Sequence, residues 1–576
     1  MRHVGLGLAV ACVVACRPEP HAAEAREAPE IARAAAPTTV VVKTGGSGAA
    51  YGPPGEVSNR FAYIPPQCYA KTDTGRGRSA RNPCYTCHTD APPPNYVRDG
   101  DLQVRRALPK GALQNRWQNL FDPPVRRAPP LPDEDVLRRV RTPNYLVDGE
   151  NVLALALRSL PAAWDGQGDG KWDGFVPDVG YRFDEDGFDH LADGTETGWR
   201  AFAYYPLPGA FMPTNGSIGD VLVRLAPEFR QNGAGEPDRE TYVANLAIVE
   251  ALASERDVAI APVDEARLGT DLDLDGRLGV ARRVAFRAGS GGATSMHYAG
   301  KARTVEESGE LPIAAGLFPV GTEFFHTVRY LDVGEGGRVV PAARLKEIRY
   351  ARKQRWYAPA DLKAVVEGEA REQAKTEDGS LPVLWAFDHG IDNGQGWNFQ
   401  GFIEDEKGSL RPQTFEETAY CAGCHGGVGR TTDSIFSFSR KLPDGSFRRG
   451  WFHFSQRGLQ GVADPRTASG DSEYGRYLRE AAGGDDYAGN EDVRRRFLDD
   501  RGALRPDALS ELRQDVTTLL LPSRERALAL DRAYLATVRE QSFIRGRDTL
   551  LGPVSQVVGL ARADDRTGVE RPIRWP

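Results

Sequence analysis

Two short stretches of this sequence share the pattern Cys-x-x-Cys-His, at residues 84–88 and 421–425. In this pattern each of two thiols, three positions apart, can add to a vinyl group of haem, and the following imidazole then lies beneath the iron. The chain has only 7 Cys and 9 His in 576 residues, so two chance copies can be set aside. The motifs predict two covalently bound haem c groups, with attachment through Cys84, Cys87, Cys421 and Cys424 and proximal iron ligation by His88 and His425.

A zinc site is the alternative, because two Cys-x-x-Cys pairs could close a tetrahedron of four thiolates around one ion. Zinc does not explain why His follows immediately in both copies. The pairs of a zinc ribbon also usually lie much closer in sequence than residues 84 and 421. Haem attachment is therefore the favoured interpretation.

On these ten residues the sequence resembles the di-haem c-type cytochromes. The resemblance implies redox iron and electron transfer at the cell envelope, with redox proteins as partners. Two alternatives stay open: a di-haem oxidoreductase or peroxidase with one open haem iron, and a haem-containing sensor or binding lipoprotein. No catalytic residues can be assigned, although Glu323, His326 or Arg329 could polarise a bound peroxide, so the question of enzymatic activity is left open.

The sixth iron ligands are the next question, because Met or His there would make an electron carrier. Beyond the initiator the sequence has only Met212 and Met296, and neither follows the second motif. Histidines form the larger pool, and His453 alone lies downstream of that motif. The candidates for the distal iron positions are His453, His326, His297, His389 and Met212.

The first sixteen residues predict an export signal. A short basic start is followed by an apolar run at residues 4–15 that is too brief to span a bilayer. The run ends in Val-Val-Ala-Cys, which resembles the bacterial lipobox, with Cys16 as the lipidated residue. Cys12 or a plain cleaved signal peptide is the alternative. We expect an exported protein of the periplasm or outer membrane, bound to the membrane by its N-terminal lipid anchor.

Charge and cysteine usage exclude other classes. The net charge is −7 and the arginines are interspersed with acidic residues, so no nucleic-acid partner is expected. Because four of the seven cysteines belong to the motifs, a disulfide framework is not expected. Cys68 is open to three interpretations: a buried small hydrophobe, a sixth iron ligand or a reactive thiol.

Two acidic loops predict calcium binding. Asp271, Asp273 and Asp275 alternate before Gly276, as in the first half of an EF-hand loop. Position twelve is Arg282, so a paired-helix EF-hand is not expected, and Asp264 or Glu265 would have to complete the shell. The second loop repeats the alternation with Asp165, Asp169 and Asp173. The competing interpretation is ordinary Asp-Gly turn chemistry on a solvated surface.

The pattern of apolar residues predicts an α+β protein of several domains, with loop-rich haem-binding segments and helices flanking a mixed α/β middle region. We expect a signal peptide at 1–16, a flexible Ala/Pro-rich linker at 17–55, a first haem segment at 56–150, the region of the acidic loops at 151–300, and a second haem domain with a helical C-terminus at 301–576. Strands are predicted at 221–225, 280–286 and 324–331. Helices are predicted at 242–253, 345–355, 360–375 and 525–541.

Overall fold

The computed structural model describes residues 57–71, 84–88, 99–209, 212–375, 383–426, 432–466, 470–480, 489–562 and 565–572. The predicted signal peptide with Cys16 and Cys12, and the linker up to residue 55, lie outside the described residues. The chain from Val42 onward forms one compact unit. The helices in its described part are all too short or too polar to cross a bilayer.

The elements of the described residues are bounded as follows. The helices are α1 (Cys84–Cys87), α2 (Asp99–Val104), α3 (Asp133–Arg141), α4 (Val152–Ser159), α5 (Arg239–Ser254), α6 (Glu265–Leu268), α7 (Lys301–Glu307), α8 (Pro359–Lys375), α9 (Phe415–Ala419), α10 (Ala422–His425), α11 (Ser437–Arg440), α12 (Glu473–Glu480), α13 (Glu491–Phe497), α14 (Pro506–Leu512), α15 (Thr517–Leu520) and α16 (Arg524–Glu540). The strands are β1 (Leu146–Val147), β2 (Glu150–Asn151), β3 (Arg182–Phe183), β4 (Phe188–His190), β5 (Glu196–Phe202), β6 (Val221–Arg224), β7 (Val258–Asp264), β8 (Val280–Val284), β9 (Glu323–Val333), β10 (Val339–Lys353), β11 (Leu384–Trp385), β12 (Ile391–Asp392), β13 (Trp397–Glu404) and β14 (Leu410–Pro412).

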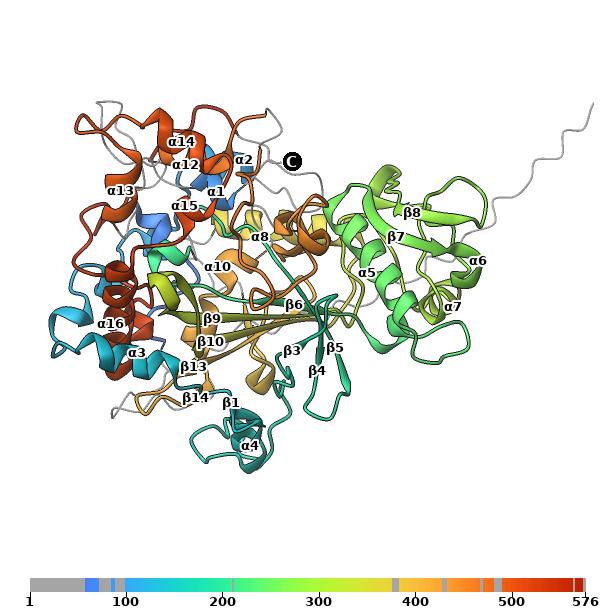
Figure 1. Ribbon diagram of the computed structural model, residues 1–576, viewed down its shortest axis with the longest axis horizontal. Coiled ribbons are helices and arrows are strands. Elements are labelled where there is room, and N and C mark those ends of the chain that lie inside the picture. The colour runs from blue at the N-terminus through green and yellow to red at the C-terminus, as the bar shows by residue number, and fades with distance from the viewer. Residues whose placement is uncertain are drawn as a thin grey trace, which may run out of the picture. The chain divides into compact units, whose positions relative to one another are not determined.

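A ten-stranded antiparallel sheet lies at the centre of this unit (Figure 1). Its strands run in the order β11-β12-β13-β10-β9-β6-β5-β4-β3, and β14 pairs with β13. The long hairpin of β9 and β10 forms its middle, while α3 and α16 pack against that hairpin. The predicted α+β class is confirmed at this level, with more sheet than the sequence indicated.

Both faces of the central strands β9 and β10 are buried, since successive side chains of a strand point to opposite faces and most positions of these two strands are buried. On β9, Phe324 and His326 share one face and Phe325 lies on the other. Cross-strand pairing places Val221 and Arg349 opposite His326, so these side chains share its face. That face packs against the largest apolar core, which includes Phe399 and Cys421, whereas Phe325 belongs to a second core.

One predicted helix is wrong. Residues 345–355 fall almost entirely in β10. The charged side chains of this stretch lie inside the protein, since Lys346, Glu347 and Lys353 are all at most 2% exposed. Glu347 and Lys353 are buried with oppositely charged partners, and Lys346 Nζ donates to the carbonyl of Gly216. Charged side chains are seldom buried without such partners, and the sequence alone does not reveal them.

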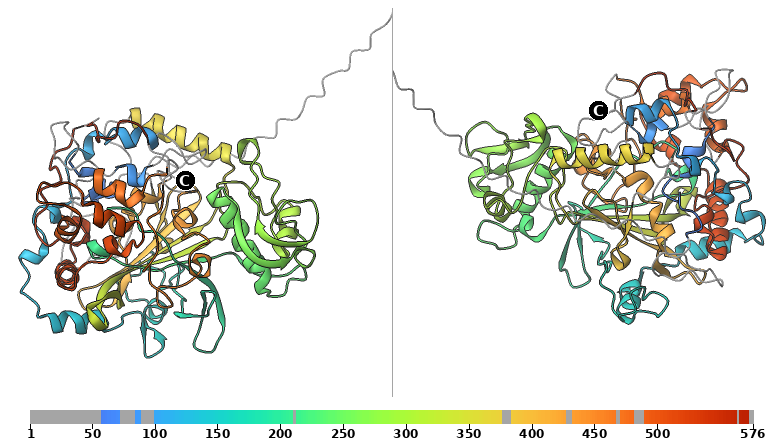
Figure 2. Two further views of the ribbon diagram at one scale, coloured as in Figure 1. Left: turned by 45° about the horizontal axis from the view of Figure 1, so that its top comes forward. Right: turned by 180° about the vertical axis from the view of Figure 1, so that it is seen from behind.

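The other predicted elements are confirmed. β6, β8 and β9 account for the three predicted strands, and α5, α8 and α16 account for the remaining helices. The Asp238 side chain caps α5 by accepting a hydrogen bond from Thr241 N, and Ser523 caps α16 in the same way. α5 packs against β7 and β8, which form a separate two-stranded sheet (Figure 2).

A late segment of the chain pairs with an early one. Isolated bridges join Ala70 to Val557, Arg105 to Arg566 and Gln114 to Leu560. In addition, Lys71 N donates to Gln556 O at 2.7 Å. The residues around the first Cys-x-x-Cys-His motif are therefore held by residues more than 400 positions later in the sequence.

Candidate functional site

The second motif is positioned by a capping box. The Thr414 hydroxyl accepts from Glu417 N, and the Glu417 carboxylate accepts from Thr414 N, so α9 begins at Phe415. Arg411 holds the same carboxylate at 2.8 and 2.9 Å. α9 leads directly into Cys421 and α10, where His425 N donates to Cys421 O at 2.9 Å. The motif is thus one helical turn fixed at both ends.

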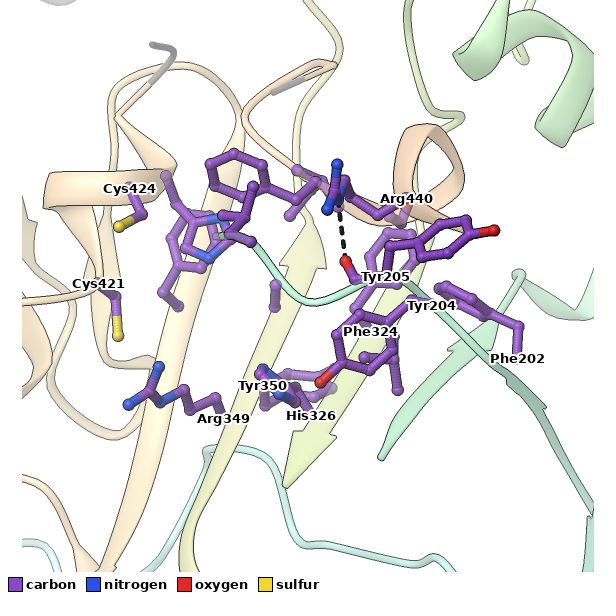
Figure 3. A pocket seen from close by; sticks show the side chains of 18 of the residues that line it. Phe202, Tyr204, Tyr205, Phe324, His326, Arg349, Tyr350, Cys421, Cys424 and Arg440 are labelled. Carbon is purple, nitrogen blue, oxygen red and sulfur yellow. Dashed lines mark hydrogen bonds between the residues drawn. The ribbon is translucent and has the colours of Figure 1, made fainter. Parts of the chain in front are cut away.

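A cavity lies between this motif and the central sheet (Figure 3). Its volume is about 150 Å³. One wall is the face of β6, β9, β10 and β13, and the other comes from residues 202–207 and 435–440. Most lining side chains are aromatic or aliphatic. The remainder are mainly His326, Arg349, Cys421, Cys424, His425 and Arg440.

His425 is held in one orientation. Its Nδ1 lies 2.8 Å from Ser434 O, a carbonyl that can only accept, so Nδ1 carries the proton and Nε2 keeps its lone pair. The ring stacks on Phe399 with centroids 5.0 Å apart. Burial lowers the pKa of His425 to about 4, with the Ser434 bond opposing and Arg349 adding to the shift. The imidazole is therefore neutral at ordinary pH and can ligate a metal.

The loop that presents Ser434 is strained. Asp433 and Ser434 are non-glycine residues at φ 50° and 66°, a region that L residues rarely occupy. A fully buried ion pair holds them there, since Lys353 Nζ lies 2.6 and 2.7 Å from the two Asp433 oxygens. Asp433 also accepts from Phe318 N at 3.0 Å. The ion pair therefore fixes the carbonyl that orients His425.

His326 is the one predicted distal candidate that lines this cavity among the residues the structure describes. Its place follows from the pairing of β6, β9 and β10. Burial lowers its pKa to about 3, and the positive charge of Arg349 and the nearby His425 contribute. Two neutral imidazoles thus share one apolar cavity.

The structure places the other four candidates elsewhere. His453 Nε2 lies 2.5 Å from Asp220 Oδ1, and its Nδ1 lies 2.7 Å from Ser455 Oγ. His297 pairs with Glu306 at 2.6 Å. His389 is exposed, and the Met212 sulfur accepts from Gly209 N at 3.2 Å. As iron ligands, these four residues stay predictions.

The first motif lies beside the second. α1 and His88 line a smaller cavity of about 40 Å³, together with Cys68 and Cys424. Cys424 and Tyr420 also line the larger cavity, so the two motifs meet although 337 positions separate residue 84 from residue 421. The role of Cys68 was left open from the sequence, and the structure places it among the motif thiols.

Burial raises the pKa of four of these thiols, those of Cys68, Cys84, Cys421 and Cys424. The pKa of Cys84 reaches about 12. No disulfide joins the five cysteines of the described residues. Since a thiolate is the reactive form, this site does not favour thiol–disulfide catalysis.

Carboxylate side chains cluster in one of the two acidic loops, the one that contains Asp271 and Asp273. Oxygens of Glu265, Asp271 and Asp273 lie within 4.8 Å of one another, and within the described residues no other group of three or more acidic, His or Cys ligands does so. Asp275 accepts from Arg277 N at 2.8 Å. In the other loop, Asp165 accepts from three backbone amides. Asp169 accepts from Lys171 N, whereas Asp173 contributes its backbone N–H to Asp388.

The comparisons with known proteins point to lipoproteins. The profile of a lipoprotein family matches residues 54–508. A protein of Aquifex aeolicus (strain VF5), described as an uncharacterized lipoprotein, is 30% identical over 553 residues, covering 84% of this chain and 85% of its own length. No solved structure matches the chain.

These matches correct the assignment to the di-haem c-type cytochromes. The matching family spans both motifs and is a lipoprotein family, and neither description names haem or electron transfer. As functions, electron transfer, di-haem oxidoreductase or peroxidase activity, and the role of a haem-containing sensor or binding lipoprotein are withdrawn with the assignment, and nothing supports the expected redox partners. The resemblance rested on ten residues, and such a local pattern defines a chemistry more than a family.

The predicted export and lipid anchor agree with the family, because lipoproteins are exported and are held at a membrane by acyl chains. The family profile covers most of the chain, and the Aquifex aeolicus relative matches over most of both chains. This chain therefore belongs to that family of lipoproteins.

Proposed function

We propose that this lipoprotein binds a flat, largely apolar ligand in the cavity beside the second Cys-x-x-Cys-His motif. The observation that carries the proposal is the lining of the cavity, which is mainly aromatic and aliphatic and contains a few oriented polar groups. Ligand sites in proteins commonly have this composition. The face of the central sheet forms one wall of the cavity, and a planar molecule can lie along such a wall.

The predicted haem groups are a proposal for what these residues hold. The side chains at the second motif fit such a group, since Cys421, Cys424 and the Nε2 side of His425 can meet one planar molecule. Cys84, Cys87 and His88 form the equivalent set at the smaller cavity. This proposal concerns the cofactor alone and assigns no redox activity to the protein.

A structural Ca²⁺ ion is proposed at Glu265, Asp271 and Asp273. Their clustered carboxylate oxygens suit a hard cation. Glu265 also accepts from Leu272 N and Gly279 N, so an ion there would tie together the loop between β7 and β8. For the anchor, we propose Cys16 as the lipidated residue and the periplasmic side of a membrane as the location.

The ligand proposal can be tested on protein purified from the cell envelope. Intact mass under denaturing conditions, absorption spectra and mass spectrometry of an organic extract would identify a bound group and show whether it is covalent. Ala351→Trp fills the cavity from β10 and should lose the ligand, whereas Val280→Trp, at an exposed position of β8, should keep it. A folded Ala351→Trp protein with full ligand content would refute the proposal.

A further inference from the structure

We infer that the surface formed by residues 104–121 and 551–567 lies against an anionic lipid bilayer when the protein is anchored. We call it the paired surface, because backbone bridges join Arg105 to Arg566 and Gln114 to Leu560 across the two segments. This surface lies outside the two cavities. The inference depends on membership of a lipoprotein family and not on the identity of the cavity ligand.

The two segments alternate between buried and exposed side chains. Ala561 and Thr567 are buried in the later segment, and Asn115 and Trp117 are buried in the earlier one. Residues paired across two strands share a face, so the exposed side chains lie on one outward side of the pairing. These exposed side chains belong to Arg105, Gln114, Arg116, Leu560, Arg562 and Arg566.

The paired surface is basic, and its arginines form no ion pairs. Within the described residues no carboxylate pairs with the side chains of Arg105, Arg116, Arg562 or Arg566. Arg105 and Arg566 are bridge partners, a position in which like charges repel each other. Residues 104–121 contain four Lys or Arg and no Asp or Glu, although the net charge of the whole chain is −7. This local positive charge favours an anionic partner.

Large apolar side chains are exposed among these arginines. Leu560 is 69% exposed, the highest value for a large apolar side chain in the described residues. Leu551 and Phe121 are also exposed, and they lie at the same end of the pairing, where Val554 N donates to Leu120 O. Basic residues mixed with exposed apolar side chains are typical of surfaces that bind the headgroup region of a bilayer.

The described fold begins beside this surface. The Trp117 indole donates to Ile64 O at 2.9 Å, and a Cβ added to Gly111 would meet the Phe61 ring. Since the first described residue is Val57, the chain from the proposed lipid anchor enters the fold next to the paired surface. Tethering raises the effective concentration of the bilayer at such a surface.

The contact is weak without the anchor. Each basic side chain strengthens binding to an anionic bilayer about 5-fold, and salt screens this attraction beyond about 8 Å. The acyl chains therefore remain the main attachment, and the paired surface determines which side of the anchored protein faces the membrane. The first motif lies near that side, because α1 packs against α2, which ends at Val104. An acidic protein could also meet the arginines, but the exposed Leu560 and the nearby anchor favour the bilayer.

Vesicle sedimentation of the full-length Cys16→Ser protein, which lacks the proposed acylation site, tests the inference. At low salt we expect it to bind vesicles of phosphatidylcholine and phosphatidylglycerol at least about 10-fold more tightly than vesicles of phosphatidylcholine alone. Adding Arg105→Gln and Arg566→Gln should weaken binding to the anionic vesicles about 20-fold, and adding Leu560→Ser instead should weaken it about 5-fold.

The matched controls are Arg158→Gln and Leu155→Ser, two exposed positions of α4. Figure 1 shows α4 at the opposite end of the unit from α2, so both variants should bind as the parent does. All of these proteins share residues 1–57, and any binding by that stretch is therefore the same in each. The substituted side chains are exposed, so the variants should fold, which circular dichroism would verify.

Equal binding to neutral and anionic vesicles would overturn the inference, as would an arginine double variant that binds as tightly as Arg158→Gln. Binding to neither kind of vesicle would also overturn it and would point to an acidic protein as the partner. None of these results depends on a ligand in the cavities, so the proposed function is judged separately by the mass and extraction measurements.

Discussion

Replacing Lys353 by Met should destabilise the protein and disturb its second motif. The ammonium and the Asp433 carboxylate are 0% and 1% exposed and 2.6 Å apart. Met keeps the length of the side chain but removes its charge, so the Asp433 carboxylate stays buried without that counterion. Breaking one side of such a pair costs about 3–5 kcal/mol.

The loss should depend on pH. Burial raises the pKa of Asp433, and Lys353 opposes that shift. Without Lys353 the carboxyl pKa rises further, so the folded variant binds a proton that the unfolded chain releases above about pH 4. The contribution of the protonated Asp433 carboxyl to the stability of the variant is therefore lost as pH rises through the folded-state pKa. The difference from wild type should be larger at pH 8 than at pH 5.

Urea unfolding monitored by tryptophan fluorescence would measure these free energies, since Trp397 lies 5.4 Å from Lys353 Nζ. Lys363→Met is the matched control, because Lys363 is 50% exposed on α8 and its change should stay within about 0.5 kcal/mol. The Lys353→Met, Asp433→Asn double variant removes both charges and should recover part of the loss. A cost below about 1 kcal/mol at pH 8, or a double variant no better than the single one, would refute the reasoning.

Three further predictions concern other parts of the chain. Cys16→Ser should move the protein from the membrane to the soluble fraction, as fractionation with immunoblotting would show; continued membrane retention would exclude Cys16 as the anchor. Millimolar Ca²⁺ should raise the melting temperature of wild type and have no effect on Glu265→Gln, and an equal rise in both would exclude the carboxylate cluster of the β7–β8 loop. Burial, opposed by Lys346, raises the pKa of Asp531 to about 7, so the contribution of the Asp531 carboxyl to stability is present below about pH 4 and is lost as pH rises to 7. The melting temperature should therefore fall less between pH 4 and pH 7 in Asp531→Asn than in wild type. Identical melting curves for the two proteins would contradict this prediction.

The sequence indicated the elements whose residues follow a regular pattern. α16 and α5 have capping residues and apolar stripes, and β9 has a run of apolar and β-branched residues. β10 was missed because Lys346, Glu347 and Lys353 point into the protein, where their partners come from distant segments such as Gly216 and Asp433. The usual rule that charged residues lie outside fails at such buried networks.

The sequence indicated the reactive residues of the candidate site but not the residues that surround them. The motif cysteines and histidines were identified from spacing alone, and His326 was one of five distal candidates. Nothing local distinguished Arg349, Asp433 or Ser434, since their roles depend on strand register and on a strained loop. Cys68 lines the smaller cavity with Cys84 and Cys424. Cys84 is only sixteen positions from Cys68 in sequence, but Cys424 is more than three hundred positions away, so only the fold brings Cys424 close to Cys68.

The backbone pairing of residues 70–114 with residues 557–566 implies an order of events during synthesis. Cys84 and Cys87 leave the ribosome hundreds of residues before the segment that closes over their surroundings. Until that segment arrives, no native contact from it restricts access to these two thiols, and a group that must be attached there can reach them on an incompletely folded chain. Afterwards the same segment joins the early and late parts of the fold, so opening the first motif again requires breaking contacts of very long sequence separation.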